Sequence, residues 1–322
     1  NKSFSFLSLK DFYFRGSVQL AAGIIKPKLF AELYTEFLNQ KIMSLTREFV
    51  SDKEWQDNFF IAAMGSFGSS ELSFASDIDL VFVVSDIQNY PDIQKDFQRL
   101  LQNLKDNCSG LEIDCRLRPE GKSSQLVWDL EEYKKYFSNR ARIWELQAFT
   151  KCRYVLGNIE LFNSFFNHYI LTVKQKDEMS VKKEMSEMRK KLYPGLETSF
   201  NIKKSSGGLA DIDFILSFLF LSHFDLLTER KENKSSNSFE LMRKAPFKDI
   251  NFDQLEINYY SLKQIELTNQ FLFNSKLSKI PNEEIKLKKI SKECGFSNFK
   301  LFLDRLNEII EQTRKQYQNI FN

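Results

Sequence analysis

The sequence predicts an α+β protein, in which a mixed strand-and-helix unit is followed by an all-helical half. Three short apolar runs, at residues 58–64, 80–84 and 111–117, have the length and composition of strands, and a helical pattern at 93–104 lies between the last two. No strand-like alternation occurs from about residue 175 to the end. We therefore predict an N-terminal helical segment over 1–50, a strand-and-helix domain over 51–160 and a helical bundle over 170–322.

The elements of the first half can be justified in order along the chain. Phe30, Leu33 and Phe37 lie at helical spacing in the first segment. In 111–117 charged residues alternate with apolar ones, which is the two-residue period of a strand. Asp129 is placed to cap a following helix, with Glu132 completing a capping box.

The second half is predicted to consist of helices joined by polar segments. Gly207 and Gly208 precede a long apolar helix that ends at His223. Residues 229–238 are dense in charge, Asn and Ser, which predicts an exposed loop, and helical patterns resume at 252–273 and 299–321.

Composition excludes several classes of protein. The chain has 322 residues, is 42% hydrophobic and 28% charged, and carries a net charge of +3, which is too small and too interspersed for a nucleic-acid partner. The longest apolar stretches fall far short of the roughly 20 residues of a membrane span. Four cysteines without a CxxC pair indicate reduced thiols in a cytoplasmic protein. The sequence begins at Asn1 without an initiator methionine, which is compatible with a fragment of a longer chain.

A Gly-Ser turn followed by two closely spaced carboxylates is the most informative pattern. Asp77 and Asp79 flank one residue at the start of an apolar run, so in a strand they point to the same side. Two such charges repel unless a cation lies between them, and Mg²⁺ is the hard cation that oxygen ligands favour. Gly68 allows the backbone to approach a ligand, and Ser69 can contact phosphate oxygens.

The run at 111–117 supplies a third carboxylate and two cationic residues. If this strand is regular, Asp114 lies on the same side as Arg116 and Arg118. With Asp77 and Asp79 it would complete a site for two Mg²⁺ ions. Arg116 and Arg118 would then hold a triphosphate through forked hydrogen bonds.

Each feature also has an ordinary structural explanation. An Asp-x-Asp pair is commonly a solvated strand edge, a Gly-Ser turn is frequent, and Arg-x-Arg is often a surface ladder of ion pairs. In this order and spacing, however, the residue types favour a site for phosphoryl-type transfer, which mainly requires positioning and charge neutralisation.

The combined pattern resembles the nucleotidyltransferase superfamily of DNA polymerase β, which implies a polymerase β-like domain over 51–160. More narrowly, four ordered motifs resemble glutamine synthetase adenylyltransferase/deadenylylase. These motifs are GSFGSSEL with SDIDL at 65–80, DCRLRP at 114–119, WELQA with Arg153 and Gly157 at 144–157, and IK with GGLADIDF at 202–214.

The resemblance implies an enzyme that transfers AMP from ATP to a tyrosine of glutamine synthetase. The implied metal ligands and catalytic residues are Asp77, Asp79 and Asp114, with Asp114 as the acceptor of the tyrosine proton. Nucleotide binding is implied for Gly68, Ser69, Ser76, Arg116 and Arg118, and a place in the active-site cleft for Glu71, Asp211 and Asp213. The PII signalling protein and glutamine are implied as regulators.

The direction of the reaction stays open at this point. Full-length members of the family resemble a tandem of a deadenylylating and an adenylylating unit, and this chain has room for one. Residues 187–189, Glu-Met-Arg, and Asp211 directly before Ile212 favour the adenylylating unit. The alternatives are phosphorolytic removal of AMP from the modified synthetase, and a non-catalytic domain that only binds nucleotide.

Three positions depart from the family pattern. Ser66 stands where the family has Lys, Ser69 where it has a second Gly, and Asp213 where it has Glu. Asp211 and Asp213 also have a purely structural interpretation, because carboxylates in the first turn of a helix favour its dipole.

Overall fold

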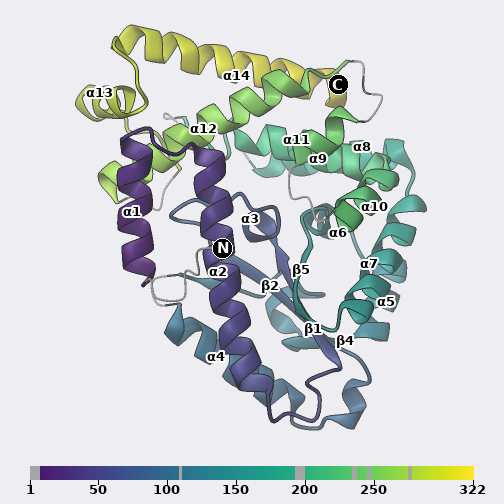
Figure 1. Cartoon of the computed structure of the whole chain (residues 1–322). Coiled ribbons are helices and arrows are strands. Elements are labelled where there is room, and N and C mark those ends of the chain that lie inside the picture. Colours follow the sequence, from purple (N-terminus) through teal and green to yellow (C-terminus); the bar gives the residue numbers. More distant parts are fainter. Residues whose placement is uncertain are drawn as a thin grey trace.

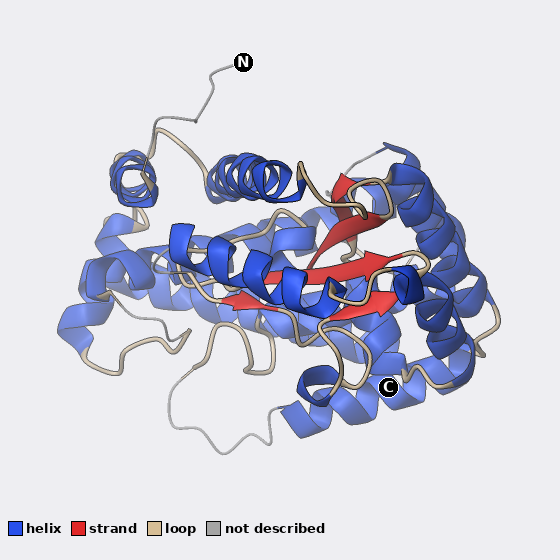
Figure 2. Cartoon of the chain, turned by 90° about the horizontal axis from the view of Figure 1, so that it is seen from below, coloured by secondary structure: helices blue, strands red, loops and turns tan. Residues whose placement is uncertain are grey.

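The computed structural model describes residues 8–108, 111–192, 200–233, 238–244, 247, 249–274 and 278–322. It has a small mixed sheet surrounded by helices, with further helices extending away from it (Figure 1, Figure 2). The predicted α+β class is therefore confirmed. The strands are β1 Phe59–Met64, β2 Ile78–Val84, β3 Ile113–Asp114, β4 Val127–Asp129 and β5 Arg153–Gly157.

Helices account for most of the described chain, and their order follows the sequence. They are α1 Leu9–Ala21, α2 Pro27–Val50, α3 Gly65–Gly68, α4 Ile93–Asn107, α5 Leu130–Asn139, α6 Ile143–Phe149, α7 Ile159–Lys174, α8 Glu178–Leu192, α9 Leu209–Ser222, α10 Phe224–Asn233, α11 Ser238–Arg243, α12 Phe252–Phe273, α13 Glu284–Glu293 and α14 Phe299–Phe321. Among the described residues, none of these helices combines the length and apolarity that a membrane span requires.

Strand β1 is the centre of the sheet. It pairs antiparallel with β2 on one side and with β5 on the other, while β3 and β4 both add parallel to the far edge of β2. All six residues of β1 are buried. Because side chains alternate across a strand, Phe60 and Ala62 join one core with α5, α7 and the C-terminal helices, whereas Phe59 and Ile61 join a second core with α1, α2 and α4.

The predicted strand at 111–117 is wrong beyond Asp114. The backbone N–H of Arg116 donates to Oδ1 of Asp114 at 2.8 Å, and this local turn removes the chain from the sheet after two paired residues. Consequently Asp114, Arg116 and Arg118 do not share one face of a regular strand.

Two further expectations are corrected. The predicted loop at 229–238 is helical at both ends, because α10 continues to Asn233 and α11 begins at Ser238, with 234–237 outside the described residues. Arg230, near the start of that stretch, is 5% exposed. The Asp129 cap is confirmed, since Oδ1 accepts from the backbone of Glu131 at 2.9 Å, but Glu132 pairs with Lys135 and does not close the box.

Candidate active site

Three aspartates meet where β2 and β3 lie side by side. Asp79 of β2 is paired with Asp114 of β3 in the parallel ladder, and on its other side it faces Met64 at the end of β1. Asp77 lies just before β2 and is exposed, whereas Asp79 is half-buried and Asp114 is 8% exposed. Tertiary structure thus places near one another the three carboxylates that the sequence assigned to a metal site, without closing them into a metal-binding cluster.

The charges of these carboxylates are incompletely balanced. Burial, followed by the neighbouring carboxylates of Asp114 and Asp77, raises the pKa of Asp79 to about 7. Burial and then the carboxylates of Glu112 and Asp114 also raise the pKa of Asp77. A raised pKa means that the negative form is disfavoured, so the site energetically favours an added cation.

Asp114 differs because Arg116 folds back onto it. Nε of Arg116 donates to Oδ2 of Asp114 at 2.5 Å, and its Nη2 also pairs with that oxygen. Burial alone would raise the pKa of Asp114, but these hydrogen bonds outweigh it and lower the pKa. The Arg116 side chain is 53% exposed, so it can leave this carboxylate without unpacking a core.

The carboxylates of Asp77, Asp79 and Asp114 are suitable ligands for Mg²⁺, but in this structure they do not yet form a complete coordination site. Carboxylate oxygens are the ligands that Mg²⁺ favours. Across the described chain, however, no group of three His, Cys, Asp or Glu side chains is already gathered as a metal-binding cluster. The contact between Arg116 and Asp114 is part of the reason, because both carboxylate oxygens of Asp114 already accept hydrogen bonds from Arg116.

The turn α3 packs tightly beneath these carboxylates. Gly65 has φ +52°, and a Cβ built there would lie 2.3 Å from Oδ2 of Asp79. A Cβ on Gly68 would lie 2.0 Å from the backbone oxygen of Lys151. Both positions therefore require glycine, the first for close approach to Asp79 and the second for contact with another backbone segment.

The guanidinium of Arg153 fixes the exit of the same turn. Its Nε donates to the carbonyl of Gly68 at 3.1 Å, and its Nη2 donates to the carbonyl of Phe67 at 3.0 Å. Arg153 comes from β5, far along the sequence, and burial lowers its pKa to about 10. The family motif contained Arg153, but the sequence did not indicate that it holds the Gly-Ser turn.

The serines assigned to nucleotide binding have protein partners. The hydroxyl of Ser69 lies 2.6 Å from Oε2 of Glu71 and 3.1 Å from the carbonyl of Gly65. Ser76 Oγ accepts from the backbone N–H of Ser73 at 2.8 Å. These contacts shape the loop between α3 and β2, and a role in nucleotide binding stays a prediction.

Arg118 is likewise engaged by the backbone. Its guanidinium donates to the carbonyls of Cys115 at 2.5 Å, Ser124 at 3.1 Å and Gln125 at 2.8 Å. This arrangement ties together the two ends of the loop that follows β3. Binding of a triphosphate by Arg118 stays a prediction, and it would require some of these contacts to be exchanged.

An ion-pair bridge joins the sheet to the helical half. Nζ of Lys151 lies 3.3 Å from Oε2 of Glu71 and 2.8 Å from Oδ1 of Asp213 on α9. Burial alone would raise the pKa of Glu71, but the Lys151 ammonium, the Ser69 hydroxyl and two further cations together outweigh it and lower the pKa. Glu71 and Asp213 thus meet through a residue that the sequence analysis missed, although it lies between Gln147 and Arg153 of a family motif.

Asp211 lies in the first turn of α9 and has protein partners there. It is 2% exposed, and it accepts from Nε of Arg189 at 2.6 Å and from the backbone N–H of Gly207 at 2.6 Å. Burial raises the pKa of Asp211 against the opposing effect of Arg189. Arg189 and Asp211, which belong to the two segments that favoured the adenylylating unit, therefore form one buried ion pair.

Lys203 is the second functional candidate that the sequence analysis missed. Burial and nearby carboxylates raise the pKa of Asp77, and the Lys203 ammonium opposes part of that rise. Its Nζ lies 3.7 Å from Oε1 of the fully buried Glu266, which also pairs with Lys263 at 3.0 Å. Lys203 thus brings positive charge from the helical half toward the carboxylates, and its place in the motif at 202–214 was the available signal.

Comparison with known proteins agrees with the motifs. Residues 20–168 match the family model described as glutamate-ammonia ligase adenylyltransferase, and residues 177–321 match the model described as GlnD PII-uridylyltransferase. A bifunctional glutamine synthetase adenylyltransferase/adenylyl-removing enzyme of Chromobacterium violaceum is 33% identical over 177 residues, which cover 51% of this chain and 19% of that protein. The equally named protein of Nitrosomonas europaea is 34% identical over 176 residues, again 51% and 19%.

The matched part corresponds to about a fifth of the length of these relatives. The strand-end aspartates and the Gly-Ser turn lie within residues 20–168, the segment that matches the adenylyltransferase model. Residues 20–168 are therefore similar to the glutamate-ammonia ligase adenylyltransferase family.

Proposed function

We propose that this chain transfers AMP from ATP to a tyrosine hydroxyl of glutamine synthetase, at a site built on Asp77, Asp79 and Asp114. The observation that carries the proposal is the pairing of Asp79 on β2 with Asp114 on β3, with Asp77 two residues away, in a chain that is similar to adenylyltransferases. Burial and the two neighbouring carboxylates also raise the pKa of Asp79 to about 7. Titratable groups perturbed in this way are concentrated at functional sites.

The three aspartates would hold Mg²⁺, with two ions as the favoured number. When bound, Mg²⁺ neutralises phosphate charge and orients the reacting oxygens. Asp77 and Asp79 contribute charge from one strand, and Asp114 from its neighbour. Asp114 is also the candidate to accept the proton from the tyrosine hydroxyl, because its lowered pKa keeps it ionised.

The cations around the site would orient the phosphates of ATP. Arg116 is half-exposed and already adjacent to Asp114, and Lys203 acts electrostatically on Asp77 from the helical half. We assign phosphate contact to these two residues ahead of Arg118, whose guanidinium already donates to three carbonyls. Gly65 keeps the turn close to Asp79, and Gly68 keeps it close to the backbone of Lys151.

The proposed direction is adenylylation, with phosphorolytic deadenylylation as the second candidate. Glutamine and the PII protein are proposed regulators, and a cytoplasmic location follows from the proposed protein substrate. A polymerase β-like arrangement of the strands is part of the same proposal, supported by the adjoining positions of the three aspartates.

A labelling experiment tests the function. The chain is incubated with glutamine synthetase and α-labelled ATP, and in parallel with AMP-modified synthetase and phosphate. α-labelled UTP serves as a control for nucleotide choice, because the helical half matches a uridylyltransferase model. We expect Mg²⁺-dependent labelling by ATP. Release of ADP without labelling would assign the chain to deadenylylation, and ATP binding without either reaction would support a non-catalytic domain.

A further inference from the structure

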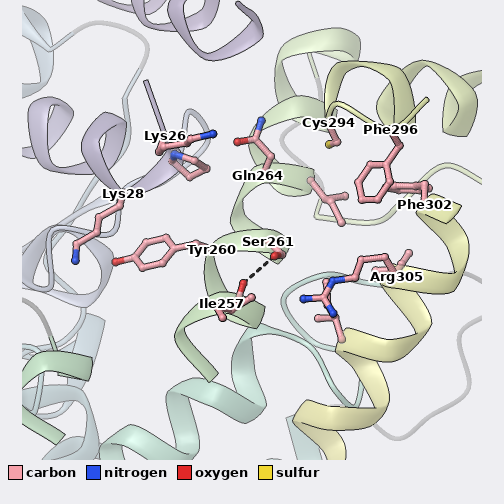
Figure 3. A pocket seen from close by; sticks show the side chains of 14 residues that line it. Lys26, Lys28, Ile257, Tyr260, Ser261, Gln264, Cys294, Phe296, Phe302 and Arg305 are labelled. Atoms are coloured by element: carbon pink, nitrogen blue, oxygen red, sulfur yellow. Dashed lines mark hydrogen bonds between the residues drawn. The ribbon is translucent and has the colours of Figure 1, made fainter. Parts of the chain in front are cut away.

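A cavity of about 410 Å³ opens in the helical half, outside the aspartate site. Its walls come from three parts of the chain that are distant in sequence: the start of α2, the middle of α12, and the α13–α14 connection with α14 (Figure 3). The volume is within the range typical of small-molecule sites. None of the residues that we assign to AMP transfer lines it.

The walls are mainly apolar. The apolar lining comes from α12, the α13–α14 connection and α14: the exposed Ile257, the half-buried Phe296, and the buried Ile265, Phe302, Leu306 and Ile309. Ser261 already donates its hydroxyl to the carbonyl of Ile257 at 2.7 Å. The cavity therefore suits a hydrocarbon or aromatic body with few polar atoms inside.

Its charged lining is of one sign. Lys26, Lys28 and Arg305 line the cavity, and no carboxylate does so among the described residues. Lys28 is 3.4 Å from Glu256 and Arg305 is 2.6 Å from Glu308, whereas Lys26 has no ion-pair partner within the described chain. In Figure 3 the ends of Lys26 and Arg305 extend toward α12 from opposite sides.

Helix α12 separates this cavity from the aspartate site. Ile257, Ser261 and Gln264 face the cavity, and by helical periodicity Lys263 and Glu266 lie on the opposite face. That opposite face holds the ion pair with Lys203, so the cavity and the site use different sides of one helix. A ligand in the cavity would therefore not compete with ATP for space.

We propose that this cavity binds a small amphipathic anion: an apolar, preferably aromatic, body that fills the cavity and one sulfonate, carboxylate or phosphate group at Lys26 and Lys28. The apolar volume accommodates the body, and the excess of positive charge selects the anionic group. This inference does not depend on AMP transfer.

The test compares two fluorescent probes that differ in one group. The sulfonate 8-anilinonaphthalene-1-sulfonate and its neutral analogue N-phenyl-1-naphthylamine are titrated into the full chain. We expect one saturable site, occupied more tightly by the sulfonate. Replacing both Lys26→Ala and Lys28→Ala should weaken the sulfonate about threefold to tenfold and leave the neutral probe unchanged.

Two further variants locate the site. Ser261→Phe, which would fill the cavity, should abolish binding of both probes, and Lys10→Ala on the exposed surface of α1 should change neither. Circular dichroism checks that each variant is folded, and the double lysine variant decides the question if Ser261→Phe is not. Equal affinity for both probes, or sulfonate binding unaffected by the variants at the cavity, would overturn the proposal.

Discussion

The carboxylates at the strand ends and those in the helical half are neutralised in different ways. Asp77 and Asp79 lie beside other carboxylates, and their pKa values are raised. Glu266, in α12, is completely buried, yet the ammonium groups of Lys263 and Lys203 outweigh its burial and lower its pKa. The fold therefore supplies enough positive charge to balance the buried Glu266. At the strand ends it supplies too little positive charge to balance Asp77 and Asp79.

This difference separates structural charge from functional charge. A buried ion pair such as Lys263 with Glu266 is costly to break, because removal of one partner leaves an uncompensated charge. A cluster of like charges is instead unfavourable until a ligand arrives. Substitutions in the two regions should consequently have opposite effects on stability and activity.

The largest expected effect is at the strand ends. Asp79→Asn should reduce AMP transfer to on the order of 1% or less, because it removes a charged ligand from the reacting centre. In the absence of Mg²⁺ the melting temperature should stay the same or rise, since a repulsive charge is lost. Labelling from α-labelled ATP and thermal unfolding are measured together, with the exposed Asp52→Asn as the matched control. Near-normal turnover in Asp79→Asn would contradict the metal assignment.

Breaking a buried ion pair in the helical half should instead lower stability. Arg189→Ala leaves Asp211, which is 2% exposed, without its cation and should lower the free energy of unfolding by about 3–5 kcal/mol. Denaturant unfolding provides the measurement. Lys288→Ala removes an exposed pair with Glu284 and should cost at most about 0.5 kcal/mol. If Arg189→Ala and Lys288→Ala lowered the free energy of unfolding equally, the buried ion pair would not have the structural role assigned to it.

Arg116 and Arg118 sharpen the comparison within a single loop. Arg116→Ala should raise the KM for ATP roughly tenfold, with little effect on unfolding, because its guanidinium is exposed and free to exchange partners. Arg118→Ala should instead lower stability by about 1–3 kcal/mol, since it leaves three carbonyls without their donor. ATP titration and thermal unfolding of both variants are compared. If the two outcomes are exchanged, Arg118 is the phosphate-binding residue.

The smallest expected effect is at Lys203, which pairs with Glu266 in the helical half and acts electrostatically on Asp77 at the strand ends. Lys203→Gln should raise the KM for ATP by about threefold to tenfold through loss of positive charge near Asp77. Stability should change little, because Glu266 keeps Lys263 at 3.0 Å. Steady-state kinetics at low and high salt provide the check, and the effect should shrink as salt rises. An effect on kcat alone would argue against phosphate contact.

Much of the fold was predictable from residue patterns. The apolar runs at 58–64 and 80–84 correspond to β1 and β2, because buried central strands require continuous apolar residues. β4 and β5 were missed, since three to five residues carry too little periodicity to stand out. The strand at 111–117 was overextended because its alternating charges have the strand period, whereas the Asp114 turn depends on one side-chain hydrogen bond.

By itself, the sequence determined the order and spacing of the aspartates, the glycines of the turn and the similarity of residues 20–168 to an adenylyltransferase family. Tertiary structure decided the partners of those residues. Lys151 joins Glu71 to Asp213, and Arg153 holds a turn 85 positions away. Such contacts depend on how packed elements meet across the chain, and spacing along the sequence carries no record of that geometry. The same packing leaves the strand-end carboxylates short of positive charge, which is the physical basis of the proposed site.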